Sequence, residues 1–339
     1  MKISIFGSGG WGTAIALLLR ENGHTVTLWS HSDAEAEQLA RERENPLLRG
    51  IALPEDIHIT SDIAKAAAGL ELAVLATPSY AVSETAKKLK TLLPPDCVVV
   101  CASKGIEKDT ARLFSGILRE HLGENARIVS LSGPTHAEEV ARRVPTACVA
   151  ASDDLSAAER VQDIFMNDNF RVYTSTDVVG VELGAALKNV IALCAGISDG
   201  LDFGDNTIAM LATRGLAEIA ALVAARGGRK ETVAGLAGLG DLIVTCTSRH
   251  SRNRRAGVLI GRGLSARDAM REVGAVVEGY YAAKAAKELA DETGMELPIC
   301  REAYAVLYEN KPPLDAMRAL MRRTKRSEWE TGGEAWVIK

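Results

Sequence analysis

The sequence has little of what marks a metal-binding, disulfide-rich or nucleic-acid-binding protein. Its six cysteines form no C-x-x-C pair, and its six histidines form no H-x-x-x-H or H-E-x-x-H pattern. We therefore expect reduced cysteines and no metal site. The net charge is only −4, from 40 basic and 44 acidic residues, which argues against general binding to nucleic acid.

Long uninterrupted apolar runs are also scarce. The only stretch of membrane-spanning length, residues 178–197, carries Glu182 and Lys188 within it, and both charges oppose insertion of a lone helix. Glycines at 7–12 break any apolar core of a secretory signal. We expect a soluble, cytoplasmic protein without membrane insertion, and the 339 residues are enough for two domains.

What the sequence does have is a complete dinucleotide-binding fingerprint. Residues 2–6 predict a buried strand and residues 13–19 an apolar helix, and Gly7, Gly9 and Gly12 between them form the pattern G-x-G-x-x-G. Gly7 allows the tight turn, Gly9 lets the backbone approach a pyrophosphate, and Gly12 allows close packing of helix and strand. The N–H groups that begin the helix then point at the phosphates.

The end of the second predicted strand, residues 24–30, bears on the choice of cofactor. An enzyme strict for NAD usually places Asp or Glu there to hold the ribose 2′-hydroxyl. Here Ser30 and His31 occupy that end, and the nearest carboxylate is Asp33. A 2′-phosphate is then admissible and His31 could donate to it, although His31 as a solvated loop residue is an equal alternative. We predict that NADP(H) is accepted, and a preference for it over NAD(H) stays open.

The order of apolar segments predicts two domains, 1–175 and 176–339. In the first, strand-like runs alternate with helices, which is typical of a Rossmann-type doubly wound α/β sheet. These runs are 70–76, 97–101, 127–131, 147–150 and 170–173. In the second, alanine-rich segments with helical spacing predict an all-helical domain, with residues 242–244 as an ambiguous strand. The predicted helices are 178–195, 208–225, 266–272, 280–293 and 299–308.

Candidate polar groups follow two of the predicted strands. Lys104 comes after the strand 97–101, which places an ammonium at the edge of the sheet where ligands bind, although a Lys-Gly pair is also an ordinary turn. Gly133, Thr135 and His136 follow the strand 127–131. Backbone N–H groups there, with the Thr135 hydroxyl, suit an anionic or carbonyl ligand. The alternative is that Thr135 caps the next helix and that His136 only begins it.

Lys188 lies on a helical face that offers its charge no partner. Its neighbours three and four positions away are all small or apolar: Gly184, Ala185, Ile191 and Ala192. The side chain therefore either extends to solvent or points into a polar pocket. In a pocket, desolvation or a second cation such as Lys104 would suit it to acid–base chemistry.

A glycine-rich run, residues 235–246, is followed by four arginines between Arg249 and Arg255. The run lacks the Gly-Lys-Ser/Thr ending of a P-loop, so an ATPase is excluded. The arginines suit a phosphate, because guanidinium binds phosphate oxygens bidentately, and a solvated basic loop is the alternative. Asp241, within the run, could orient a lysine ammonium or cap a turn.

Taken together, these motifs resemble the NAD(P)-dependent glycerol-3-phosphate dehydrogenases of the bacterial type, over nearly the whole chain. The matching motifs are 7–12, 103–105, 132–137, 187–189, 238–242, 251–253 and 277–279. The resemblance implies a Rossmann domain joined to a helical domain. It also implies reversible reduction of dihydroxyacetone phosphate to sn-glycerol 3-phosphate with NADP(H) and/or NAD(H), which supplies phospholipid synthesis.

Carried over by motif, Lys188 is the implied proton donor in ketone reduction. The implied substrate contacts are Lys104, Gly133, Thr135, Lys188, Asp241, Ser251, Arg252 and Asn253. The implied cofactor contacts are the glycine turn Gly7, Gly9, Gly10, Trp11 and Gly12, together with His31, Lys104, Ala137, Arg252, Val276 and Glu278. Many members carry Ala or Ser at two positions where this chain has Ser8 and Gly10, and both of these residues are small enough to keep the fingerprint.

Two other functions fit parts of the pattern. One is a dehydrogenase of similar architecture that acts on a carboxylate, such as a β-hydroxyacid or ketopantoate. The other is a redox sensor that binds a dinucleotide without turnover, for which Lys188 and the arginines have no obvious use. The expected partner is a small phosphorylated substrate. A homodimer is compatible with the sequence but no motif indicates it, and the preference between NADH and NADPH and any feedback regulation are not fixed either.

Overall fold

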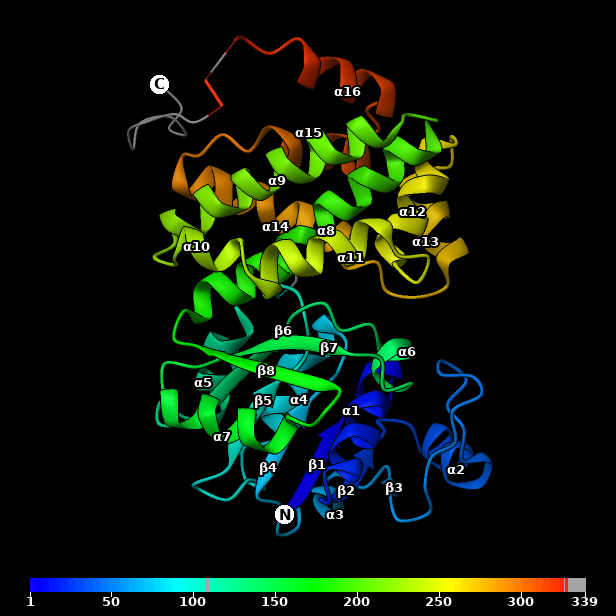
Figure 1. Cartoon of the computed structure of the whole chain (residues 1–339), viewed down its shortest axis with the longest axis vertical. Helices are drawn as coiled ribbons and strands as arrows, with labels where there is room; N and C mark the ends of the chain where they lie inside the picture. Colours follow the sequence, from blue (N-terminus) through cyan, green and yellow to red (C-terminus); the bar gives the residue numbers. More distant parts are fainter. Residues whose placement is uncertain (108–109, 326, 329–339) are drawn as a thin grey trace. The chain divides into compact units, whose positions relative to one another are not determined.

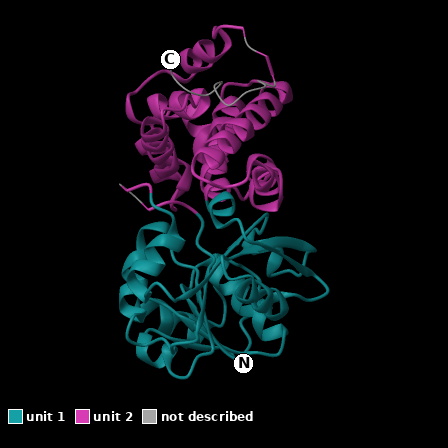
Figure 2. Cartoon of the chain, turned by 90° about the vertical axis from the view of Figure 1, so that its left-hand side faces the viewer, with its two compact units in different colours: residues 1–104, 112–182 teal, residues 105–111, 183–339 magenta. Residues whose placement is uncertain are grey.

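The computed structural model describes residues 1–107, 110–325 and 327–328. By its contacts the chain divides into two compact units (Figure 2). Unit 1 comprises Met1–Lys104 and Arg112–Glu182, and unit 2 comprises Gly105–Ala111 and Leu183–Lys339. Residues 176–182 thus group with unit 1, whereas the sequence analysis placed the boundary between 175 and 176. Glu182 accounts for this, because its buried carboxylate accepts hydrogen bonds from the hydroxyls of Ser115 (2.8 Å) and Ser130 (2.5 Å). The exact domain boundary stays a prediction.

Unit 1 is built on one sheet whose described strands number eight, in the order β3-β2-β1-β4-β5-β6-β7-β8. Neighbouring strands from β3 to β6 are parallel, and the order reverses between β1 and β4, which confirms the predicted doubly wound sheet. The strands are β1 (Lys2–Phe6), β2 (Thr25–Trp29), β3 (His58–Thr60), β4 (Leu72–Leu75), β5 (Val98–Cys101), β6 (Arg127–Ser132), β7 (Thr146–Ala151) and β8 (Phe170–Ser175).

Strand β7 pairs antiparallel with β6, and β8 runs parallel to β7. The sequence predicts a strand at both segments but not the direction of either. A parallel return needs a crossover connection, usually through a helix. The chain between β6 and β7 carries only the four-residue helix α6 (Ala137–Val140), and β7 returns antiparallel. Strand β3, of three residues, was not predicted.

Helices cover both faces of this sheet (Figure 1). In β1, β2, β4, β5 and β6, buried residues enter two separate cores; Ile3 and Ile5 of β1, for example, pack into one core and Phe6 into the other. Burial on both faces explains why these strands read as continuous apolar runs. The helices of unit 1 are α1 (Gly10–Glu21), α2 (Asp33–Glu42), α3 (Ile63–Ala67), the short η1 (Ser79–Ala81), α4 (Val82–Leu89), α5 (Phe114–Leu122), α6 and α7 (Leu155–Phe165).

The described part of unit 2 is entirely helical, as predicted. It consists of α8 (Val178–Gly200), whose first residues belong to unit 1, α9 (Asp205–Ala225), α10 (Lys230–Val233), the π-helical turn η2 (Leu236–Gly240), α11 (Asp241–Thr247), α12 (Arg252–Gly261), α13 (Ala266–Val273), α14 (Glu278–Thr293), α15 (Pro298–Tyr308) and α16 (Pro313–Met321). The possible strand at 242–244 is wrong, since these residues lie inside α11. Three of the four arginines, Arg252, Arg254 and Arg255, lie in α12 and not in a loop, whereas Arg249 lies in the turn before this helix.

Helices α8 and α12 approach each other backbone to backbone through glycines. A methyl group at Gly196 would lie 2.1 Å from the carbonyl oxygen of Arg254, and one at Gly257 would lie 2.2 Å from that of Leu193. Both distances are far below a van der Waals contact, so these glycines set the spacing of the two helices. This contact fixes the N-terminus of α12, where Arg252 lies, against α8, which carries Lys188.

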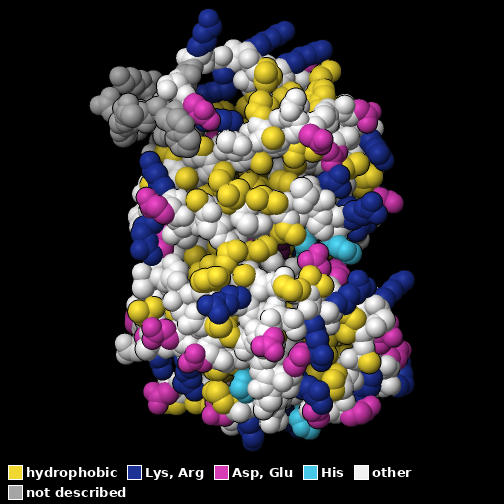
Figure 3. Space-filling model, in the orientation of Figure 1, with side chains coloured by type: hydrophobic (Ala, Val, Ile, Leu, Met, Phe, Trp, Pro, Cys, Tyr) yellow, Lys and Arg dark blue, Asp and Glu magenta, His cyan; other side chains and the backbone are white. Residues whose placement is uncertain are grey.

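Helices α8 and α9 are long and apolar enough to cross a membrane by length and composition, each with a mean hydropathy of 1.7. The prediction that residues 178–197 are the only stretch of this kind is therefore wrong, because α9 meets the same criterion. The apolar window of α8 is 89% buried within the protein. A core helix of a soluble protein meets the same criterion, so the finding is weak evidence for a membrane span. Acidic and basic side chains are interspersed over the face drawn in Figure 3.

Candidate functional site

The glycine turn of unit 1 has the geometry that the fingerprint requires. Gly7 has φ +126°, and a methyl group there would lie 2.6 Å from the carbonyl oxygen of Ala76. One at Gly12 would lie 1.9 Å from the carbonyl oxygen of Gly7. A methyl group at Gly9, by contrast, would meet no described atom within 4 Å. Gly7 and Gly12 are thus needed for packing, and Gly9 faces space into which a ligand can enter.

The residues around this turn are suited to hold a dinucleotide. Gly9 is the N-cap of α1 and makes no side-chain capping bond, which leaves the first-turn N–H groups of α1 for phosphate oxygens. The hydroxyl of Thr77, just after β4, is buried and has no hydrogen-bond partner among the described residues. Such an orphaned donor calls for an explanation, and a bound cofactor supplies one. Thr77 was not among the predicted site residues.

Three further predicted cofactor contacts lie in or beside the turn: Gly10, Trp11 and Ala137. The indole of Trp11 donates a hydrogen bond to the carbonyl oxygen of Ala102 (3.1 Å), which ties the start of α1 to the end of β5. A methyl group at Gly10 would lie 3.7 Å from Cβ of Ala137. Gly10 and Ala137, both implied as cofactor contacts by the family resemblance, therefore lie side by side.

The end of β2 differs from the expectation. Ser30 is completely buried, and its hydroxyl donates a hydrogen bond to the Glu35 carboxylate at 2.7 Å. The carboxylate nearest the end of this strand is therefore Glu35 and not Asp33, because the first turn of α2 brings its third residue back over the strand end. His31 is largely exposed, and its Nδ1 lies 3.9 Å from Glu35.

Lys104, Gly133 and Thr135 are brought together at the ends of β5 and β6. The Lys104 ammonium donates to the Gly133 carbonyl oxygen at 2.7 Å, and the buried Thr135 hydroxyl donates to the same oxygen at 3.2 Å. His136, not Thr135, is the N-cap of α6, so the alternative that Thr135 caps this helix is wrong. Lys104, Gly133 and Thr135, which come from two sequence motifs, thus form one polar cluster in unit 1.

Lys188 in unit 2 is buried in a polar pocket. Its ammonium, on α8, donates hydrogen bonds to Asp241 Oδ1 (3.1 Å) and to the Thr245 hydroxyl (2.6 Å), both on α11. The Thr245 hydroxyl in turn donates to the Asp241 carbonyl oxygen at 2.5 Å. The hypothesis that Asp241 orients a lysine ammonium is confirmed, and extension of Lys188 to solvent is excluded. Thr245 was missed, although it lies one helical turn from Asp241 once 241–247 is read as a helix.

Asn253 and Ser251 fix the start of α12. The Asn253 amide donates to Oδ1 of Asn189 (2.8 Å) and accepts from the Gly279 N–H (2.8 Å), which links α8, α12 and α14. Ser251 is the N-cap of α12 and accepts from the Arg254 N–H at 3.2 Å. These contacts place Arg252 as the first residue of the helix, with its side chain exposed.

The four arginines of this segment do not share one role. Arg254 pairs with Asp199 of α8 at 2.5 Å, which stabilises the packing of α12. Arg249, Arg252 and Arg255 are exposed. The remaining predicted cofactor contacts of unit 2, Val276 and Glu278, lie just before and at the start of α14, and both are partly buried.

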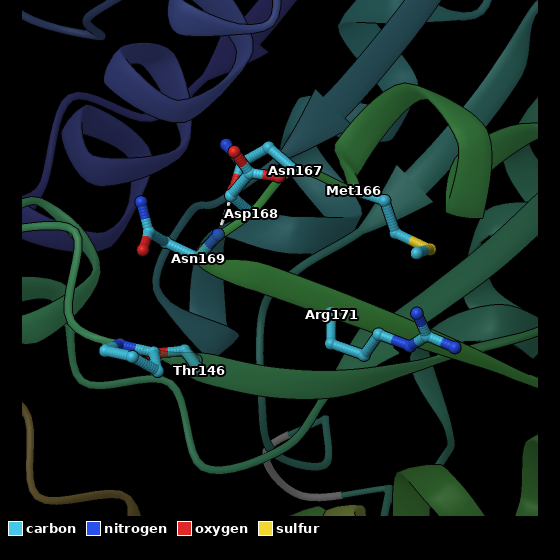
Figure 4. Close-up of a pocket in the computed structure, with 7 residues that line it drawn as sticks. Thr146, Met166, Asn167, Asp168, Asn169 and Arg171 are labelled. Atoms are coloured by element: carbon cyan, nitrogen blue, oxygen red, sulfur yellow. Dashed lines mark hydrogen bonds between the residues drawn. The ribbon is translucent and has the colours of Figure 1, made fainter.

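A surface pocket of unit 1 contains none of these residues. It measures about 520 Å³ and is lined by Pro145, Thr146, Met166, Asn167, Asp168, Asn169 and Arg171 (Figure 4). The side-chain oxygen of Asn167, Oδ1, accepts hydrogen bonds within its own turn from the backbone N–H groups of Asn169 (2.9 Å) and Phe170 (2.8 Å). Within the described ranges, no group of three or more His, Cys, Asp or Glu side chains is placed to hold a metal ion.

Comparisons with known proteins agree along the whole chain. The family model described as the NAD-dependent glycerol-3-phosphate dehydrogenase N-terminus matches residues 2–158, and that of the C-terminus matches residues 177–318. The glycerol-3-phosphate dehydrogenase [NAD(P)+] of Thermoanaerobacter sp. (strain X514) is 51% identical over 328 residues, 97% of this chain and 99% of the relative. That of Moorella thermoacetica is 50% identical over 332 residues, 98% of each chain. The crystal structure of glycerol-3-phosphate dehydrogenase from Coxiella burnetii superposes with a TM-score of 0.91 at 35% identity, covering 95% of this chain and 99% of that one.

Proposed function

The chain belongs to the NAD-dependent glycerol-3-phosphate dehydrogenase family, and we propose that it reduces dihydroxyacetone phosphate reversibly to sn-glycerol 3-phosphate with NADH or NADPH. The observation that carries the mechanism is the buried Lys188–Asp241 pair. A lysine held in this way is a proton donor that needs no metal or second cofactor. The product would supply the glycerol phosphate backbone of phospholipids.

The nicotinamide cofactor supplies the hydride that reduces C2 of the triose phosphate. We assign its pyrophosphate to the N–H groups that follow Gly9, with Gly10, Trp11 and Ala137 beside them. His31, Lys104, Arg252, Val276 and Glu278 complete the proposed cofactor contacts. Each of these assignments follows from the sequence motifs, and the geometry of the glycine turn supports the first.

Proton transfer falls to Lys188. As hydride reaches the carbonyl carbon, negative charge develops on the C2 oxygen, and the Lys188 ammonium protonates it. Asp241 and Thr245 hold the ammonium in place, so it need not be reorganised at the moment of reaction. In the direction of alcohol oxidation the neutral amine takes the proton back. Lys104, Gly133 and Thr135 are the proposed further contacts to the substrate.

Arg252 is the proposed phosphate ligand, with Ser251 and Asn253 beside it. An exposed guanidinium at the first residue of a helix combines bidentate hydrogen bonding with the positive end of the helix dipole. Binding energy from the phosphate, which does not react, can then be used to position the reacting carbon. Cytoplasmic location, the absence of membrane insertion and a homodimer stay predictions.

The decisive experiment follows the absorbance at 340 nm after dihydroxyacetone phosphate is added to the purified protein with NADPH. The same measurement is repeated with NADH. Oxidation that requires the phosphate, and is absent with unphosphorylated dihydroxyacetone, is expected. Inhibition by small carboxylates but not by triose phosphates would instead favour a carboxylate dehydrogenase. If a folded, cofactor-bound protein oxidises neither cofactor, the proposed reaction is wrong and a redox sensor is the alternative.

A further inference from the structure

A carboxylate is held at the end of β2 by a hydroxyl of the strand itself. Ser30 follows the last residue of β2 and is completely buried, and its hydroxyl donates to Oε2 of Glu35 at 2.7 Å. The same hydroxyl oxygen accepts from the Ser32 N–H at 3.3 Å. Glu35 is therefore not a freely moving surface side chain. Its position is set by the strand end and by the first turn of α2.

This strand end lies directly beside the glycine turn. Phe6, the last residue of β1, is opposite Trp29, the last residue of β2, and the Gly7 N–H donates to the Trp29 carbonyl oxygen at 3.0 Å. Ser30 therefore directly follows Trp29, whose carbonyl oxygen accepts the hydrogen bond from Gly7, the first glycine of the fingerprint. In dinucleotide-binding folds, the ribose next to the adenine is recognised at the end of this strand.

Glu35 keeps its charge available for a ligand. The Ser30 hydroxyl that holds the Glu35 carboxylate is neutral, and the Glu35 side chain is still 38% exposed. The Nδ1 of His31 lies 3.9 Å from Oε2 of Glu35, and the His31 side chain is 80% exposed. A carboxylate in this position can accept hydrogen bonds from the two ribose hydroxyls, whereas it faces a 2′-phosphate with charge of the same sign.

We propose that Glu35 determines the choice between the two cofactors and favours NADH over NADPH. The inference rests on the proposed function, since it concerns the cofactor of that reaction. It reverses the expectation drawn from Ser30, His31 and Asp33, which found no carboxylate to oppose a 2′-phosphate. His31 beside Glu35 offers a donor to the same phosphate, so NADPH still binds but less tightly than NADH.

The test is the substitution Glu35→Gln, which keeps the size of the side chain and an oxygen that can accept from Ser30, and removes the charge. Dissociation constants for NADH and NADPH are measured by nicotinamide fluorescence without substrate, at low and high salt. We expect NADPH to bind about tenfold more tightly in the variant at low salt, with the binding of NADH unchanged or weakened. In the unsubstituted protein, high salt should reduce the difference between the dissociation constants for NADH and NADPH.

The matched control is Asp33→Asn, which makes the same change in charge two residues away in the same helical turn. Asp33 is exposed, and we expect the ratio of the two dissociation constants to stay unchanged in this variant. A ratio in Glu35→Gln equal to that of the unsubstituted protein, or a loss of affinity shared equally by both cofactors, would overturn the proposal.

These outcomes are separable from failure of the proposed function. Cofactor binding is measured without dihydroxyacetone phosphate, so the ratio for Glu35→Gln stands whether or not turnover occurs. If the protein turns over but Glu35→Gln leaves the ratio of the two dissociation constants unchanged, only the role of Glu35 is refuted. A changed ratio in a protein that never oxidises either cofactor with dihydroxyacetone phosphate would refute only the reaction.

Discussion

Lys188 on α8 and Asp241 on α11 form an ion pair of 3.1 Å with side chains only 6% and 3% exposed. Removing two charges from water costs free energy that a single ion pair does not fully return, so such a pair is weak evidence of a stabilising role. Its retention in the middle of unit 2 is better explained by chemistry. In the proposed reaction, the pair would hold an ammonium where a developing alkoxide can take its proton.

The first prediction separates the two contributions of this pair. Lys188→Ala should abolish turnover and leave NADH binding intact, because the glycine turn is untouched. It should also lower the free energy of unfolding by about 3–5 kcal/mol, since the buried Asp241 carboxylate loses its ion pair with Lys188. Urea denaturation and the 340 nm assay measure the two effects.

The double variant Lys188→Met with Asp241→Asn is the control for that prediction. With no charge left unpaired, it should recover most of the lost stability and still show no turnover. Near-normal turnover in Lys188→Ala would remove Lys188 from the mechanism, however stable the protein is.

The second prediction concerns Thr245, whose hydroxyl accepts from Lys188 at 2.6 Å. Thr245→Val keeps the shape of the side chain but leaves the ammonium with one oriented partner fewer. We expect kcat to fall by about ten- to a hundredfold, with KM for dihydroxyacetone phosphate changed much less, since the loss falls on proton transfer. Thr245→Ser should retain most activity. Equal loss in both variants would show that the packing of the methyl group, not the hydroxyl, matters.

The glycine turn and the main strands could be predicted from the sequence because each depends on local pattern. Gly7 and Gly12 occur at fixed spacing, and buried parallel strands read as continuous apolar runs. The direction of β7 could not be predicted in the same way, because nothing local to residues 146–151 records which strand they pair with. Residues 242–244 were ambiguous because three apolar residues suit a strand and a buried helix equally.

The candidate site was predicted unevenly for the same reason. Lys188 was found because a lysine among small and apolar neighbours is unusual within its own helix. Its pairing with Asp241 spans 53 positions and was only one of two alternatives. Glu35 was missed because its carboxylate reaches Ser30 only when the first turn of α2 has formed. Asp33 is the carboxylate nearest to Ser30 along the chain, but sequence distance does not show which carboxylate reaches it in the fold.

The third prediction tests the phosphate ligand. Arg252→Ala should raise KM for dihydroxyacetone phosphate by about a hundredfold or more, because a bidentate, charge-assisted contact is lost. Arg255→Ala is the matched control, since Arg255 is exposed on the same helix. Steady-state kinetics on both variants provide the measurement. An unchanged KM in Arg252→Ala would show that another group binds the phosphate.

The fourth prediction tests the glycine contact between α8 and α12. Gly196→Ala would place a methyl group 2.1 Å from the Arg254 carbonyl oxygen, and two backbones cannot move apart without disturbing both helices. We expect a loss of about 3 kcal/mol or more in the free energy of unfolding. Gly116→Ala in α5, where no described atom lies within 4 Å, should be neutral or stabilising by up to about 1 kcal/mol. Similar stability of the two variants, measured by chemical denaturation, would contradict this account.

The fifth prediction concerns pH and the buried Glu218 of α9. Its carboxylate accepts from the N–H groups of Ile299 (2.8 Å) and Cys300 (3.2 Å), at the first turn of α15. Burial nevertheless dominates and raises the pKa of the Glu218 carboxyl to about 7, from 4.5 in an exposed chain. Between these two values the folded protein binds a proton that the unfolded chain has released.

It follows that Glu218 destabilises the fold as pH rises. Below pH 4.5 both states are protonated and the group contributes no penalty, and above about pH 7 its full cost of about 3 kcal/mol is present. The free energy of unfolding should therefore fall between pH 5.5 and 8 by more in the unsubstituted protein than in Glu218→Gln, which cannot titrate. Parallel curves for the two proteins would mean that the two backbone N–H groups, together with the more distant Arg323, keep Glu218 ionised in the folded state at pH 5.5.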